Sequence, residues 1–166
     1  MATQTGQKDA DLEILLEIGE SLLSDGDAAG ALQAFTEVLA HAPRNTDALV
    51  GKGRALMTLD RDEQALRFLE LATSVSPDRA TPWMLLGTAA LANGNGEVAA
   101  RAFAQAQHLG LAPSESYLNL ARAAYFNLDQ EKAHDYVQLA LTEDPGNDDA
   151  RAWSEALDAI SNRAAF

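Results

Sequence analysis

The chain has 166 residues, of which 47% are hydrophobic, and it contains no cysteine. This is enough apolar material for one folded domain, and the lack of cysteine excludes a disulfide framework and any thiolate metal site. The formal net charge of −13 argues against nucleic acids and anionic membranes as partners, because acidic side chains repel phosphate groups.

Residues 1–11 precede the patterned part of the chain, and we expect a flexible N-terminal segment there. They lack the basic start and apolar centre of a signal peptide, and no apolar run in the chain approaches the length of a membrane span. We therefore expect no membrane insertion and a cytoplasmic location. A periplasmic location stays open, because periplasmic proteins can also lack cysteine.

From residue 12 onward, residue types recur with a period of 34 positions. Two of the recurring positions are small, two are large and apolar, and a fifth holds proline in most units. In phase, these positions are Gly19, Gly53, Gly87 and Ala121; Ala31, Ala65, Ala99 and Ala133; Leu15, Leu49, Trp83 and Tyr117; Phe35, Leu69, Phe103 and Val137; and Pro43, Pro77 and Pro145. Five positions in phase indicate internal repeats, which divide the chain into the units 12–45, 46–79, 80–113 and 114–147.

Each unit is predicted to form two short helices joined by a turn. Apolar residues step by three and four, as in Leu15, Ile18 and Leu22, which we expect to face the core of the first unit. The turn 24–27, Ser-Asp-Gly-Asp, stops one helix and caps the next. The prolines end the second helices, because proline has no N–H to donate. The recurring positions held by small residues, which we call the small columns, mark places where two helices cross closely.

The last segment, residues 148–166, is helical but out of phase with the repeats. Ala150, Trp153, Leu157 and Ile160 share one face, which we expect to cover the apolar edge of the last unit as a capping helix. Asn147 is the predicted N-cap of this helix. The alternative is that this face recruits a partner or a second copy of the chain.

The pattern resembles the tetratricopeptide repeat, in which a large apolar residue, Leu-Gly, Ala, Phe and Pro stand at fixed places. The third unit matches best, through Trp83, Leu86, Gly87, Ala99 and Phe103. The resemblance implies an all-α fold, a right-handed solenoid of four helical hairpins followed by the capping helix. It also implies a concave surface, lined by the first helices, that binds other proteins.

Two departures from the family pattern concern local packing. Lys52 stands at the leucine place of the second unit. In the third unit Leu111 stands at the proline place, and we expect the preceding Gly110 to end the helix instead, because glycine readily adopts the left-handed conformation.

The sequence offers no set of residues suited to catalysis, a metal ion or a cofactor. His41, His108 and His134 lie in different units without a second ligand at helical spacing. The acidic run 144–149 lacks the alternating oxygen ligands of a calcium loop, which favours a helix stop followed by a helix cap. We therefore expect a protein that is not an enzyme and binds neither cofactor nor metal.

The candidate binding residues lie one position beyond the core positions of each first helix, a rotation of roughly 100°. Most are apolar, and contiguous exposed apolar residues are typical of an interaction surface. For Leu23, Met57 and Leu91, a sealing role between adjacent hairpins is an equal alternative. Arg54 and Arg122 would bind ligand carboxylates, unless Arg54 pairs with Glu20 on the neighbouring helix. The predicted groove consists of Leu16, Glu20, Leu23, Val50, Arg54, Met57, Met84, Thr88, Leu91, Leu118, Arg122, Tyr125 and Phe126.

We therefore predict a protein–protein interaction scaffold that binds an apolar or amphipathic segment of a partner protein in this groove. The apolar character of the groove indicates that burial, rather than charge, supplies most of the affinity. Two alternatives remain from the sequence: a secretion or assembly chaperone of the helical-repeat type, and a structural scaffold that self-associates into a homo-oligomer.

Overall fold

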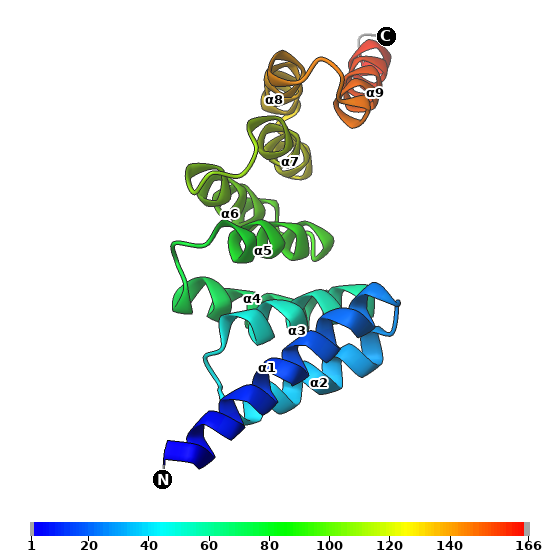
Figure 1. Ribbon diagram of the computed structural model, residues 1–166. Helices are drawn as coiled ribbons and strands as arrows, with labels where there is room; N and C mark the ends of the chain where they lie inside the picture. Colours follow the sequence, from blue (N-terminus) through cyan, green and yellow to red (C-terminus); the bar gives the residue numbers. More distant parts are fainter. Residues whose placement is uncertain (1, 165–166) are drawn as a thin grey trace. The chain divides into compact units, whose positions relative to one another are not determined.

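The computed structural model describes residues 2–164, with the side chains of residues 9–161. Residues 2–164 form nine α-helices and no strand, in agreement with the all-helical prediction (Figure 1). In chain order the helices are α1 (Ala2–Ser24), α2 (Ala28–His41), α3 (Thr46–Thr58), α4 (Asp62–Val75), α5 (Ala80–Ala92), α6 (Gly96–His108), α7 (Pro113–Phe126), α8 (Gln130–Glu143) and α9 (Asp148–Ala164).

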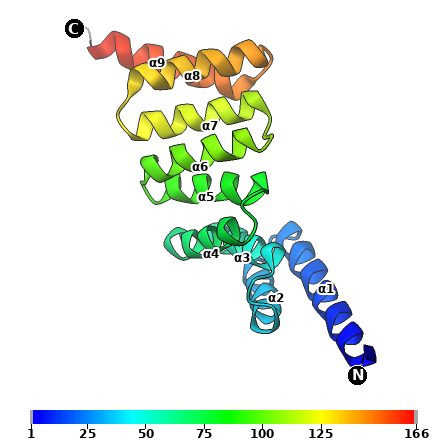
Figure 2. The ribbon, with the colours of Figure 1, turned by 90° about the vertical axis from the view of Figure 1, so that its left-hand side faces the viewer.

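The chain divides into two compact units, Met1–Asp78 and Arg79–Phe166, which we describe separately. In the first unit α1 packs against α2, α2 against α3 and α3 against α4, and α1 also contacts α3. In the second unit each of the helices α5–α9 packs against the next one along the chain (Figure 2). Short turns join the paired helices, which run in opposite directions as helical hairpins.

In the first unit, the core of each hairpin is a bulky residue of the second helix packed on a glycine of the first. A Cβ atom added at Gly19 would lie 2.7 Å from the ring of Phe35, well inside van der Waals contact. The same relation joins α3 to α4, where a Cβ atom at Gly53 would lie 2.7 Å from the side chain of Leu69. Phe35 and Leu69 are fully buried. The periodic glycines are therefore required because a large side chain of the paired helix occupies the adjacent space.

In the second unit, two different pairs of side chains fill the space between the paired helices. Between α5 and α6 the glycine–phenylalanine pair recurs, with a Cβ atom at Gly87 falling 2.5 Å from the ring of Phe103. Between α7 and α8, Ala121 replaces the glycine and Val137 replaces the large residue, and both are buried in one cluster. The added methyl group on α7 is thus balanced by a smaller side chain on α8.

The ring of Phe35 contacts a third helix as well. A Cβ atom at Gly51 of α3 would collide with the ring, which therefore fills the space between Gly19 and Gly51. Val38 of α2 and Ala55 of α3 belong to the same buried cluster. One aromatic side chain of α2 thus joins α1 to α3.

The turns at Gly26 and Gly110 have the predicted chemistry. Gly26 adopts a φ of +83°, and the carboxylate of Asp27 then accepts a hydrogen bond from the backbone N–H of Gly30 at 2.9 Å, which caps α2. Gly110 adopts a φ of +98° just beyond Leu109, the C-cap of α6. It therefore ends that helix where the family proline is missing, as expected from its freedom to take the left-handed conformation.

The turn between α7 and α8 departs from this chemistry. Leu128 has a φ of +61° at the place that Gly26 and Gly94 hold in other turns, and its side chain is 89% exposed. A left-handed conformation costs a residue with a side chain about 1–2 kcal/mol. Asp129 then caps α8 by accepting from the backbone N–H of Lys132 at 3.1 Å. A hydrogen bond from the Lys132 ammonium, 2.6 Å long, is the main cause of a lowered pKa at Asp129 and a raised pKa at Lys132.

Lys52, at the leucine place of the second repeat, lies over an aromatic ring. Its ammonium nitrogen stands 4.3 Å from the centre of the Phe68 ring on α4. Burial lowers the pKa of Lys52, and the positive charge of Arg61 lowers it further. The methylene chain of a lysine can cover apolar surface while its charged head stays accessible, which explains how lysine substitutes for leucine here.

Two features of α1 differ from the expectation. Helix α1 begins at Ala2, so residues 2–11, expected to be a flexible segment, are helical. No proline interrupts this stretch, and a helix that has formed extends at little further cost. Ile18, expected in the core, is 44% exposed, because α1 packs against α2 and α3 and Ile18 lies on its remaining side.

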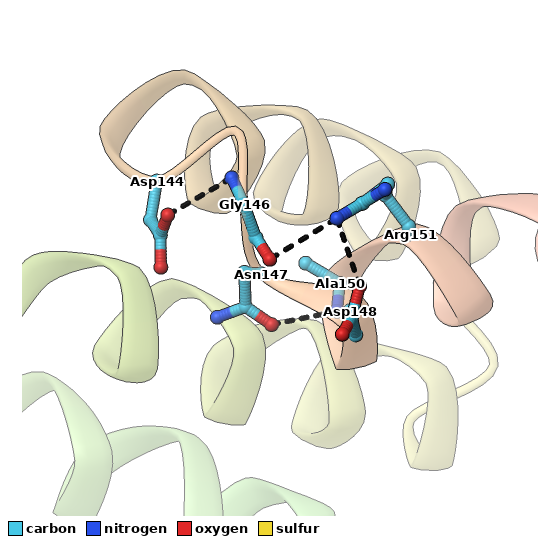
Figure 3. A network of polar contacts seen from close by, with 6 residues as sticks. All are labelled: Asp144, Gly146, Asn147, Asp148, Ala150 and Arg151. Carbon is cyan, nitrogen blue, oxygen red and sulfur yellow. Dashed lines mark hydrogen bonds and ion pairs between the residues drawn. The ribbon is translucent and has the colours of Figure 1, made fainter.

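The acidic run between α8 and α9 forms a helix stop followed by a helix cap, as predicted (Figure 3). The carboxylate of Asp144 accepts a hydrogen bond from the backbone N–H of Gly146 at 2.9 Å and closes the turn. The side-chain oxygen of Asn147 accepts from the backbone N–H of Ala150 at 2.9 Å and caps α9. These oxygen atoms are therefore engaged in local structure.

The Asn147 cap also ties α9 to the two preceding helices. Its amide nitrogen donates to the hydroxyl of Ser114 on α7 at 3.0 Å, and that hydroxyl donates to the carbonyl of Ala140 on α8 at 3.2 Å. Arg151 donates to the carboxylate of Asp148 at 2.8 Å on the outer side of the same helix start (Figure 3). The first turn of α9 is thus fixed to α7 and α8.

The apolar face of α9 packs against the hairpin of α7 and α8. Ala150 and Leu157 are buried, and Leu157 belongs to the cluster formed by Ala121 and Val137. The ring of Trp153 meets the ring of Tyr125 edge to face, with centroids 5.6 Å apart. These contacts place α9 against both helices of the preceding hairpin.

The replacement Ala99→Leu should destabilise the protein, because Ala99 on α6 is fully buried in one of the small columns. Overpacking of this kind costs about 1–3 kcal/mol of unfolding free energy. Urea unfolding followed by circular dichroism measures it. The matched control is Ala104→Leu, an exposed position on the same helix, which should change stability by less than about 0.5 kcal/mol. Equal effects would show that the small column does not mark a close helix crossing.

Candidate partner-binding surfaces

The predicted groove residues of the first unit lie on α1 and α3. Leu16 and Leu23 are half-buried and pack against the cluster around Phe35, so part of their surface seals the hairpins. Met57 is half-buried as well. These three residues offer partial apolar surface rather than an open row.

Val50 was expected to face the groove, and this expectation is wrong. Its side chain is only 7% exposed. Helix α3 contacts α1, α2 and α4, so little of its circumference remains free. Val50 belongs to the core.

Arg54 and Glu20 form an ion pair across α1 and α3. The guanidinium nitrogen Nη1 lies 2.7 Å from Oε2 of Glu20, and both side chains are about half exposed, at 42% and 50%. The structure therefore contains the pair that the sequence left as an alternative to ligand binding. An exposed pair of this kind contributes about 0–1 kcal/mol, so Arg54 can exchange Glu20 for another carboxylate at little cost.

The second unit places its first three groove residues on α5. Met84 and Leu91 are half-buried, and Thr88 is exposed. The hydroxyl of Thr88 donates to the backbone carbonyl of Met84 at 3.1 Å, so its donor is used within the helix and its oxygen can still accept.

Leu118 on α7 was also expected to face the groove, and this too is wrong. It is 5% exposed and packs in a cluster with Ala140 of α8 and Ala150 of α9. Helix α9 packs over Leu118. The angular position of Leu118 on its own helix could not indicate this contact. Phe126, at the end of the same helix, is 52% exposed.

Arg122 on α7 has partners within its own unit. Its guanidinium donates to the side-chain oxygen of Asn119 at 3.2 Å, and a second nitrogen lies 3.9 Å from a carboxylate oxygen of Asp149 on α9. The long separation from Asp149 makes this a weak ion pair. Arg122 therefore lies beside α9, one helical turn before Tyr125.

An apolar cavity of about 310 Å³ opens between α7 and α9. Tyr125 contributes one wall from α7, and α9 contributes the rest. The lining residues are Tyr125, Ala152, Trp153, Ala156, Leu157 and Ile160. Its size suits a single large aliphatic or aromatic side chain, and its walls carry almost no polar atoms.

Sequence reasoning found only part of this cavity. Tyr125 was a predicted groove residue, and Trp153 and Ile160 were assigned to the covering face of the tail helix. Ala152 and Ala156 were missed, because a search for exposed large residues overlooks positions where a small side chain leaves room. Their recurrence at a spacing of four beside Trp153 was the available signal.

Nothing in the described part of the chain resembles a metal centre or a membrane span. Residues 9–161 contain no group of three His, Cys, Asp or Glu side chains close enough to hold a metal ion. His134 lies 3.7 Å from the carboxylate of Asp158, a two-residue contact between α8 and α9. No helix within residues 2–164 has the length and hydrophobicity to cross a bilayer.

Comparison with known families gives two matches, both to models described as tetratricopeptide repeat. One covers residues 22–88 and the other residues 84–148. No curated protein matches the sequence.

Several solved structures share the fold. MamA from Desulfovibrio magneticus superimposes with a TM-score of 0.83 at 18% identity, over 91% of this chain and 85% of the other. A thermophilic tetratricopeptide-repeat protein from Thermus thermophilus gives a TM-score of 0.73 at 23% identity, over 92% and 84% of the two chains. An O-GlcNAc transferase mutant from Thermobaculum terrenum gives 0.73 at 22% identity, over 81% of this chain and 26% of the transferase. At these identities the similarity establishes the fold alone.

The replacement Leu118→Glu should lower stability strongly, because a carboxylate would be buried among Ala140 and Ala150 without a partner. We expect a loss of at least about 3 kcal/mol, the usual scale for an uncompensated buried charge. Phe126→Glu, at an exposed position on the same helix, should change stability by less than about 0.5 kcal/mol. Thermal melting of the two variants provides the comparison, and a stable Leu118→Glu protein would restore Leu118 to the binding surface.

Proposed function

Because this chain belongs to the tetratricopeptide-repeat family, we propose that it is a non-catalytic scaffold that binds an apolar or amphipathic segment of a partner protein. The all-helical fold and the family support a protein-interaction scaffold in general. The specific proposal is that the segment anchors in the cavity between α7 and α9, without a cofactor or metal.

The cavity is the observation that carries this proposal. Its walls are apolar, and burial of one leucine- or phenylalanine-sized side chain is worth about 1.5–3 kcal/mol. The exposed ring of Phe126 and the half-buried side chains of Met84 and Leu91 supply further apolar surface in the same unit. Such a surface favours partners that bury hydrophobic area over partners held by charge.

The proposed architecture is a right-handed solenoid of four hairpins, in repeats 12–45, 46–79, 80–113 and 114–147, with α9 as a capping helix. The hairpin pairs α1–α2, α3–α4, α5–α6 and α7–α8 support the repeat division. Leu157 of α9 is buried against α7 and α8, and Leu118 of α7 is buried against Ala150 of α9. Both contacts support the capping role, because end repeats need a cover for their apolar edge.

Deletion of residues 148–166 tests the cap. The shortened chain would expose Leu118 and Val137, so we expect a lower melting temperature and concentration-dependent association. Differential scanning calorimetry and analytical ultracentrifugation report the two effects. A shortened chain that stays monomeric with an unchanged melting temperature would leave α9 free for another role.

The replacement Ala156→Leu tests the binding site directly. Ala156 lines the cavity yet is itself exposed, so a leucine there should fill the cavity and leave the fold intact. Proteins captured from cells of the source organism by the wild-type chain would be identified by mass spectrometry and titrated by calorimetry. We expect Ala156→Leu to weaken binding by about tenfold or more, which is about 1.4 kcal/mol.

The matched control is Ala104→Leu, which adds the same side chain at an exposed position of α6 outside the cavity. It should bind as the wild type does. Unimpaired binding by a folded Ala156→Leu protein would move the site away from α7 and α9. Ultracentrifugation of the wild type over a range of concentrations separates a partner-binding scaffold from one that self-associates.

A further inference from the structure

The hairpin of α1 and α2 has an unpartnered apolar side. Ile14 and Ile18 on α1 are 54% and 44% exposed, one helical turn apart. A shallow cavity of about 470 Å³ lies along α2 and is lined by Leu32, Gln33, Thr36, Glu37 and Ala40. The two helices thus present a row of isoleucine side chains and a shallow trough.

Both features face away from α3. Glu20 reaches α3 through its ion pair with Arg54, and Ile18 stands two residues earlier, a rotation of about 200° around α1. On α2, Val38 is buried with residues of α3, and Thr36 and Ala40 stand two residues to either side of it, again about 200° away. The isoleucine row and the trough therefore lie on the same side of the hairpin, opposite α3.

From residue 9 onward, the charged side chains of this hairpin are all acidic. From residue 9 to residue 41 the chain contains eight acidic residues and no lysine or arginine. Glu17, next to Ile18, and Glu37, in the wall of the trough, are both exposed. An apolar strip bordered by carboxylates is complementary to an apolar strip bordered by lysine or arginine.

We propose that this side of the α1–α2 hairpin, formed by Ile14, Ile18 and the trough of α2, is a second docking surface for a basic amphipathic helix of a partner protein. A helix suits it because the surface is itself made of two helices, whose side-chain ridges accept the ridges of a third. The charge selects the partner, since a second acidic copy of this hairpin would be repelled. The surface lies in the first unit, and its occupation does not depend on the cavity between α7 and α9.

The probe is a synthetic, dye-labelled helical peptide with leucine along one face and lysine on both flanks. A matched peptide carries glutamate in place of each lysine. Fluorescence anisotropy with the full chain, at low and at high ionic strength, measures binding. We expect the lysine peptide to bind, with an affinity that falls as salt screens the carboxylates, and the glutamate peptide to show no binding.

Two double variants locate the surface. Ile14→Ser with Ile18→Ser should weaken binding of the lysine peptide at least tenfold by removing the apolar row. Glu17→Gln with Glu37→Gln should weaken it several-fold and reduce its dependence on salt. All four side chains are exposed or line the surface, so circular dichroism should be unchanged.

Matched double variants in other places exclude general attraction to an acidic protein. Leu71→Ser with Leu139→Ser removes two exposed leucines, and Glu70→Gln with Glu131→Gln removes two exposed carboxylates, on α4 and α8 in each case. Both should bind the lysine peptide within twofold of the wild type, as should Ala156→Leu, whose cavity belongs to the separate proposal.

Three outcomes overturn the inference. These are the absence of binding by the lysine peptide, an equal loss in the matched controls, and binding of the glutamate peptide with similar affinity. Ultracentrifugation can give a further contradicting outcome. If the wild type forms a dimer that Ile14→Ser with Ile18→Ser abolishes, the surface binds a second copy of the chain rather than a basic helix.

Discussion

The contact on which the structure depends is that of a large side chain on the second helix of a hairpin with a small residue on the first. Where Phe35 meets Gly19, or Phe103 meets Gly87, a single added methyl group has no space. The separation of the paired helices is therefore set by these two residues together rather than by either alone. In the last hairpin the larger Ala121 on the first helix is accompanied by the smaller Val137 on the second, which fits this pairing. Turns, caps and surface residues vary around this fixed pairing.

This pairing explains why the helices were predictable from the sequence, whereas the exposure of the candidate binding residues was predicted only in part. The core columns repeat every 34 residues, so each is supported by several positions at once. Groove residues were placed by their angle on a single helix, which describes their relation to their own hairpin. Val50 lies on α3, which has three neighbouring helices, and Leu118 is buried against Ala150 of α9. The angle of a residue on its own helix contains no information about these neighbours. The cavity at Ala156 escaped prediction for a related reason, because it depends on how far apart α7 and α9 lie.

Two groups of acidic residues have different physical roles. Asp27, Asp129 and Asp144 accept hydrogen bonds from backbone N–H groups in turns and at helix starts, so their charge is tied to local structure. Glu17 and Glu37 stand exposed on the first hairpin, where no lysine or arginine occurs between residues 9 and 41. The acidic residues behind the net charge of −13 are thus not equivalent. The first group stabilises turns and helix starts. The second group makes one side of the α1–α2 hairpin acidic.

The position of Phe35 between Gly19 and Gly51 has a consequence for the dynamics of the first unit. A local opening that detaches α1 removes one wall of the ring's site and leaves the other in place, so α2 and α3 keep a shared contact while α1 moves. Opening of α2 removes the ring from both walls together and breaks both interfaces in one step. Amide protons of α2 should therefore exchange with solvent only in the larger, cooperative event, whereas those of α1 have an independent and easier route. In α7 the residue 68 positions after Gly51 is Asn119, so the second unit has no glycine at this place.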